Sequence, residues 1–132
     1  MYNWLMTDMA RFTILVADDE RSNLVVFNHI LFPEYTLLTA KTGGEALRRA
    51  RDETPDLILL DIMMPDMSGF DVLAELKKHE STLRIPVIIV SGLDGRDDRT
   101  KGFRLGAAGF ITKPVKRGEL LKEIEGNIGK LA

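Results

Sequence analysis

Residues 56–61 have the sequence DLILLD, an apolar run with a carboxylate at each end. Its four central residues show no alternation between apolar and polar side chains, unlike a strand with one face in water. Such runs are typical of strands in parallel sheets, which helices cover on both faces. We therefore expect residues 56–61 to form the central strand of an α/β domain.

The segments on either side of this run alternate between strand and helix patterns. Apolar residues at helical spacing, such as Leu24, Phe27 and Leu31, predict amphipathic helices between short apolar strands. The expected strands are residues 12–17, 35–40, 56–61, 87–91 and 110–112. The expected helices are residues 20–31, 45–51, 68–79, 94–105 and 117–128. This succession of β–α units predicts one parallel sheet with helices on both faces.

The composition is that of one ordinary globular domain. The chain has 132 residues, of which 45% are hydrophobic and 29% charged, with no cysteine and a net charge of −2. These values exclude disulfides and thiolate chemistry, and they disfavour direct binding to nucleic acid. No apolar run is long enough to span a bilayer, and the N-terminus lacks the pattern of a signal peptide, so we expect a cytoplasmic protein with no membrane partner. Residues 1–11 are expected to be an extension of a domain that covers residues 12–130.

Polar side chains follow four of the expected strands at the points where the strands end. Asp18 and Asp19 follow the first strand, Asp61 ends the third, Ser91 ends the fourth, and Lys113 follows the fifth. The carboxyl ends of parallel strands lie at one edge of the sheet, and ligands bind at that edge in folds of this kind. We therefore expect three carboxylates, a hydroxyl and an ammonium group to meet there.

This set of groups favours a hard metal ion and phosphoryl chemistry. Two carboxylates about 4 Å apart repel by roughly 4 kcal/mol at an effective dielectric constant of about 20. Lys113 offsets part of this repulsion, and Mg²⁺ suits the remainder because it prefers oxygen ligands. A carboxylate can also accept a phosphoryl group as a nucleophile. Asp61 is the best candidate because it is single, ends the central strand and precedes a loop, whereas Asp18 and Asp19 are paired and better placed to hold the metal.

Four segments of the chain resemble, in order and spacing, the receiver domains of two-component response regulators. They are residues 16–20 (VADDE), 61–69 (DIMMPDMSG), 85–92 (IPVIIVSG) and 106–114 (GAAGFITKP). The resemblance extends from about residue 12 to residue 128. It implies a flavodoxin-like, three-layer (βα)5 fold with a five-stranded parallel sheet of order 2-1-3-4-5.

The resemblance also implies roles for the acidic residues. Asp61 is the implied phosphoacceptor, which takes its phosphoryl group from the phosphohistidine of a histidine kinase or a histidine phosphotransfer protein. Asp18, Asp19 and Asp61, with the backbone carbonyl of Met63, are the implied ligands of Mg²⁺. The chain is then a signalling switch and not an enzyme that turns over an external substrate.

Further implied roles concern the phosphorylated state. Ser91 bonds a phosphoryl oxygen, and Lys113 pairs with the phosphoryl group and precedes a cis bond to Pro114. Phe110 occupies the position of a switch aromatic that turns inward as Ser91 moves. The implied output surface combines residues 94–105, 110–112 and 117–128, binds a downstream output domain or protein, and belongs to a monomer or a weak dimer.

The sequence departs from the family pattern at three positions. Phe110 has no hydroxyl group, so the hydrogen bond of a tyrosine is missing there. Met63 and Leu93 are apolar at positions that in this family modulate autodephosphorylation. Apolar side chains at both positions favour exclusion of water and a longer phosphorylated lifetime.

Three other functions fit parts of this pattern. Phosphatases of the haloacid-dehalogenase type also have a strand-end aspartate nucleophile and Mg²⁺, but they usually carry a second aspartate two residues later, where this chain has Met63. A degenerate receiver could act as a constitutive interaction module, but the intact set of acids, serine and lysine argues against it. A flavodoxin-like nucleotide site is disfavoured because the acidic turn after the first strand would repel a phosphate without a metal.

Overall fold

The fold is a parallel sheet covered by helices, seen in a computed structural model of the chain in which residues 12–92 and 96–129 are described. The strands are β1 (Thr13–Ala17), β2 (Thr36–Ala40), β3 (Leu57–Asp61), β4 (Val87–Ser91) and β5 (Gly109–Thr112). The described helices are α2 (Arg21–Leu31), α3 (Gly43–Glu53), α4 (Gly69–Leu76), α5 (Arg96–Arg104) and α6 (Arg117–Ile128). The strand order is β2-β1-β3-β4-β5, and all neighbours are parallel. The expected flavodoxin-like fold is therefore confirmed.

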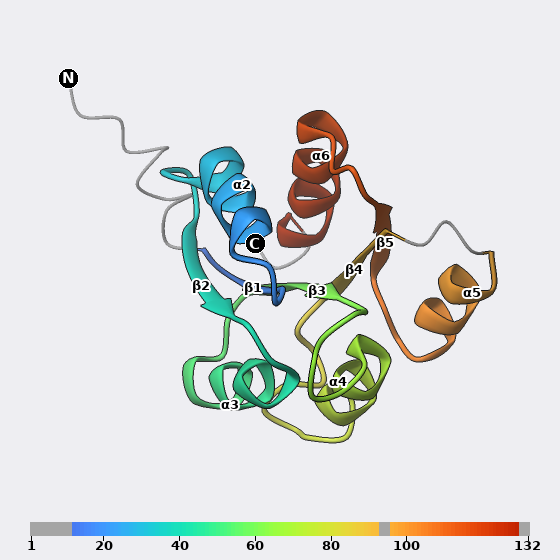
Figure 1. Cartoon of the computed structure of the whole chain (residues 1–132). Coiled ribbons are helices and arrows are strands. Elements are labelled where there is room, and N and C mark those ends of the chain that lie inside the picture. Colours follow the sequence, from blue (N-terminus) through green and yellow to red (C-terminus); the bar gives the residue numbers. More distant parts are fainter. Residues whose placement is uncertain (1–11, 93–95, 130–132) are drawn as a thin grey trace.

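Helices cover both faces of the sheet, as Figure 1 shows, with α2 and α6 on one face and α3 and α4 on the other. All residues of β3 and β4 are buried, so these two strands form the centre of the domain. Leu57 and Leu59 of β3 pack in the cluster under α2 and α6, whereas Ile58 and Leu60 pack under α3 and α4. Successive side chains of a strand point to opposite faces, so one apolar run supplies both cores.

Helix α5 buries fewer residues against the sheet than the other described helices do. Within Arg96–Arg104, Gly102 is the one buried residue, and it lies close to Ile89 of β4. Two cations of α5 lie over aromatic rings of its neighbours: Arg99 is 4.9 Å from the ring centroid of Phe110, and Lys101 is 4.6 Å from that of Phe70. The helix therefore buries little apolar surface, and two cation–π contacts connect it to its neighbours.

Helix α3 begins earlier than the sequence pattern predicted. We expected a turn at Thr42 and the two glycines, with a helix over residues 45–51, but the helix covers Gly43–Glu53. The side chain of Thr42 accepts a hydrogen bond from the backbone N–H of Glu45 at 3.1 Å. This is an N-cap, and it starts the helix immediately after Thr42. The prediction of a turn was therefore wrong.

Helix α4 ends earlier than predicted, at Leu76, although we expected it to reach residue 79. The hydroxyl of Thr82 donates to the carbonyl of Leu76 at 2.7 Å, so this carbonyl has a partner outside the helix. The Lys77 ammonium donates to two carbonyls of the following segment, each at 3.0 Å. The chain therefore folds back after Leu76 and leads into β4.

Apart from the two ends of α3, each two residues beyond the prediction, and the end of α4, the boundaries agree with the prediction to within one residue where the structure describes them. Glu20 is the N-cap of α2 and is not its first residue. The expected start of α5 at residue 94, the residue Leu93, the extension over residues 1–11 and the domain end at residue 130 lie outside the described residues. In the described part of the chain, none of the helices combines the length and apolar character needed to cross a bilayer.

The burial of the central strand β3 leads to a prediction about stability. Replacing Leu59, which is buried between the sheet and α2 and α6, by alanine should lower the free energy of unfolding by about 2–5 kcal/mol because it leaves a cavity. Urea denaturation followed by circular dichroism measures this loss. Val25→Ala is the matched control, since Val25 is 60% exposed on α2 and its truncation should change stability by less than about 0.5 kcal/mol.

Candidate functional site

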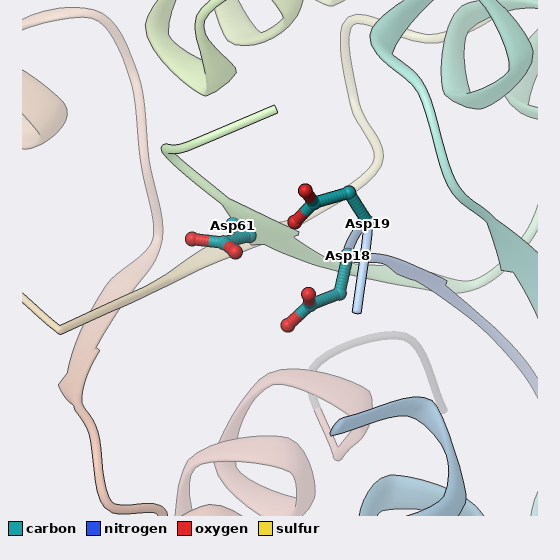
Figure 2. Close-up of side chains that lie close together, drawn as sticks. All are labelled: Asp18, Asp19 and Asp61. Carbon is teal, nitrogen blue, oxygen red and sulfur yellow. The ribbon is translucent and has the colours of Figure 1, made fainter. Parts of the chain in front are cut away.

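The strand ends bring the predicted acidic residues together at one edge of the sheet. Ala17 of β1 lies beside Leu60 of β3 in the sheet register, so the residues that follow them, Asp18 and Asp61, lie next to each other at the ends of these strands. Figure 2 shows the side chains of Asp18, Asp19 and Asp61 close together at this edge. The topology thus places residues from distant parts of the chain in one small volume.

Lys113 joins two of these carboxylates from the other side. Its ammonium nitrogen lies 3.1 Å from Oδ2 of Asp18 and 3.2 Å from Oδ2 of Asp61. The backbone N–H of Lys113 donates to the Ser91 carbonyl at 2.7 Å, which aligns the end of β5 with the end of β4. Burial alone would lower the pKa of Lys113, but its hydrogen bonds to Asp18 and Asp61 and their negative charges raise it above the usual value. The lysine is therefore held in its charged form.

Asp61 is buried in a setting that opposes its ionisation. Its side chain is almost inaccessible, and burial raises the pKa of its carboxyl above the usual range. The charge of Lys113 lowers this pKa in part, while the charge of Asp18 raises it further. The N–H of Met63 donates to Oδ1 of Asp61 at 3.2 Å. A reaction or a bound cation that neutralises the charge of this carboxylate is therefore favoured.

Asp18 is fixed by contacts that the sequence pattern did not reveal. The N–H of Glu20 donates to its Oδ1 at 2.9 Å, and the amide of Asn23 donates to its Oδ2 at 3.1 Å. Asn23 lies in the first turn of α2, and no sequence motif indicates its contact with Asp18. The sequence indicates this contact only through the separation of five residues between Asp18 and Asn23, which places them on either side of the turn from β1 to α2.

The three acids can hold one metal ion. Asp18, Asp19 and Asp61 each offer a carboxylate oxygen, and these oxygens lie within 4.8 Å of one another. Three carboxylates against one ammonium group leave two negative charges uncompensated, which matches a divalent cation. The donors are oxygens, the ligands that Mg²⁺ prefers, with no cysteine in the chain to favour a softer metal. The residues present therefore fit Mg²⁺.

The structure also describes the remaining predicted residues. Ser91 is fully buried at the end of β4, and Phe110 is buried on β5. The Lys113–Pro114 peptide bond is cis. The side chain of Met63 is 65% exposed, and the loop that contains it lines a cleft of about 440 Å³ next to Asp19. The role of the Met63 carbonyl as a ligand and the switch role of Phe110 stay predictions.

A comparison with protein families identifies the family of this chain. The family model for the response regulator receiver domain matches residues 14–125. The chain belongs to this family. Receiver domains are signalling switches that bind Mg²⁺ at an acidic pocket and interact with histidine kinases and with output domains or proteins. The expected family is confirmed and is consistent with the expected phosphoacceptor function, and the phosphatase alternative is not favoured.

Individual relatives differ in how much of their length the chain covers. Response regulator PleD of Caulobacter vibrioides is 46% identical over 103 residues, which are 77% of this chain and 23% of that protein. Protein PilH of Pseudomonas aeruginosa is 40% identical over 117 residues, which are 88% of this chain and 95% of that protein. The chain thus spans less than a quarter of PleD and nearly all of PilH.

A solved structure matches the domain closely and carries a metal. It is the receiver domain of a sensor histidine kinase from Pseudomonas aeruginosa PAO1, which has a magnesium ion coordinated in its active-site cleft. It is 28% identical, with a TM-score of 0.83, and the match covers 89% of this chain and 97% of that chain.

The raised pKa of Asp61 predicts that Asp61→Asn stabilises the metal-free protein at pH 7. The folded state favours the protonated carboxyl, so the folded wild type is penalised when this group ionises. The gain should disappear as the pH falls below the unfolded pKa of an aspartate, about 3.9, because the wild type is then neutral as well. Calorimetric melting of both proteins with a chelator at several pH values measures this difference, and a less stable variant at pH 7 would contradict it.

Proposed function

We propose that this chain accepts a phosphoryl group on Asp61 from the phosphohistidine of a histidine kinase or a histidine phosphotransfer protein. The observation that carries the proposal is the position of Asp61 at the end of the central strand, between Lys113 and two further carboxylates. Membership of the receiver family supports it.

In the proposed reaction, a carboxylate oxygen of Asp61 attacks phosphorus as the bond from phosphorus to the imidazole nitrogen breaks. The electron pair of that bond stays on the imidazole. Phosphoryl transfer depends mainly on positioning and on neutralising the phosphoryl oxygens. Lys113 is already beside Asp61, so its positive charge needs no rearrangement to reach the phosphoryl group. Ser91 supplies a hydroxyl donor for a phosphoryl oxygen.

The proposed ligands of Mg²⁺ are Asp18, Asp19, Asp61 and the backbone carbonyl of Met63. The convergence of the three carboxylates supports this assignment, as does the magnesium ion in the related Pseudomonas structure. Bound Mg²⁺ supplies positive charge that offsets the carboxylates and the incoming phosphoryl group. Removal of the metal with a chelator is therefore expected to stop phosphorylation.

The proposed output is a change in the surface formed by α5, β5 and α6. Phosphorylation adds charge that Ser91 and Lys113 pair with, and the ring of Phe110 follows the movement of Ser91. This surface then binds a downstream output domain or protein, with the chain as a monomer or weak dimer in the cytoplasm. The switch catalyses only its own phosphorylation and dephosphorylation.

The first test of this function is the substitution Asp61→Asn, which should abolish labelling by acetyl phosphate in the presence of Mg²⁺. The reason is that an amide oxygen is a poor nucleophile. Asp56→Asn is the matched control, because Asp56 precedes the same strand at its opposite end and bonds the N–H of Thr13. Intact-protein mass spectrometry detects the added phosphoryl group. Labelling that persists in Asp61→Asn shows a different acceptor, and no labelling of the wild type supports the constitutive interaction module instead.

The second test concerns Lys113. Lys113→Ala removes a charge-assisted hydrogen bond worth about 1.5–3 kcal/mol, so we expect beryllofluoride, a phosphoryl analogue, to bind at least about tenfold more weakly in the presence of Mg²⁺. Some acetyl-phosphate labelling of Asp61 should remain. Amide NMR spectra of wild type and variant measure both the affinity and the response of α5, β5 and α6. An unchanged response in the variant would falsify the role of Lys113 in the switch.

A further inference from the structure

The loop between β3 and α4, residues 62–68, forms one wall of the candidate metal site. It begins directly after Asp61, and the N–H of Met63 donates back to the Asp61 carboxylate at 3.2 Å. Residues of this loop and Asp19 line the cleft beside the acidic cluster. The path of its backbone therefore decides which groups face the carboxylates.

Asp66 fastens this loop to a different element, helix α3. Its Oδ1 accepts a hydrogen bond from the N–H of Gly43 at 2.7 Å, and its Oδ2 accepts one from the N–H of Gly44 at 2.9 Å. These N–H groups belong to the first turn of α3 and have no acceptor within the helix. The two bonds lower the pKa of Asp66, so its carboxylate stays ionised in the folded protein. A contact through both oxygens fixes the direction of the side chain as well as its position.

The packing around Asp66 requires close approach of the loop and the helix. A Cβ atom at Gly43 would collide with the side chain of Met67, so a larger residue at position 43 would force that side chain to move. At its far end, the loop is closed by the N–H of Gly69, which donates to the carbonyl of Ile62 at 2.8 Å. Asp66 is the only charged residue between positions 62 and 68. The ionic anchor of the loop is therefore a single side chain.

We propose that Asp66 is a positioning residue for the metal centre. Its two bonds to α3 hold the loop so that the backbone at Met63 faces Asp19 and Asp61, where the Met63 carbonyl completes the ligand set. The inference rests on the proposed function, because the metal is the one that function requires. It adds a residue that touches neither the metal nor the phosphoryl group, and it makes α3 part of the support of the site.

The test compares two substitutions that each remove hydrogen bonds from the same end of α3. Asp66→Ala removes the bonds that tie the loop to the helix. Thr42→Ala removes the N-cap bond to Glu45 but leaves the loop contacts in place. We expect Asp66→Ala to weaken Mg²⁺ binding roughly tenfold, as loss of an outer-shell partner does, and Thr42→Ala to change it by less than about twofold. Calorimetric titration of each folded variant with Mg²⁺ measures the affinity, and amide NMR of the metal-free proteins should show shifts at residues 62–64 for Asp66→Ala alone.

The outcomes separate the inference from the function on which it rests. Equal Mg²⁺ affinity in Asp66→Ala and wild type overturns the inference and leaves the proposed function intact. Equal weakening by Thr42→Ala also overturns it, because stability of α3 would then explain the loss. Absence of Mg²⁺ binding in the wild type overturns both. If Asp66→Ala does not fold, Asp66→Asn, which keeps one acceptor oxygen, provides the same comparison with a smaller loss expected.

Discussion

The repulsion between the buried carboxylates of Asp18 and Asp61 is the constraint on which the rest of the site depends. The two side chains are almost fully buried, and they share the ammonium group of Lys113 at 3.1 and 3.2 Å. Their arrangement persists because the paired, buried strands β1 and β3 fix the backbone from which Asp18 and Asp61 project. Packing of the apolar core thus maintains a cluster that electrostatics alone would disperse.

The same cluster explains why a cation or an electrophile is favoured at this edge of the sheet and not elsewhere on it. A carboxylate that is both buried and crowded by like charge gains most from an incoming cation. Without a bound cation, Lys113 alone offsets the negative charge of Asp61. A bound cation adds further positive charge. Lys113 contacts both Asp18 and Asp61. A change in the charge of Asp61 therefore changes the electrostatic environment of Lys113 after β5 and of Asp18 after β1.

Sequence reasoning predicted the sheet and the strand-end residues because both follow from local patterns and from topology. The run at residues 56–61 is continuous in sequence, and parallel pairing brings its end beside Asp18 without further information. It did not predict the contacts of Asn23 and Asp66, since each side chain bonds a group on another element and no periodicity records its direction. The start of α3 was missed for a similar reason: a Gly-Gly pair usually breaks a helix, and here Thr42 and Asp66 supply the missing acceptors.

The slight attachment of α5 has a mechanical consequence. A helix that buries one glycine gives up little apolar contact when it slides, and cation–π contacts at exposed sites contribute only roughly 0.5–1 kcal/mol each. Arg99 rests on the ring of Phe110, so reorientation of that ring removes one of the supports of the helix. Movement of α5 should therefore cost less free energy than movement of the buried strands β3 and β4.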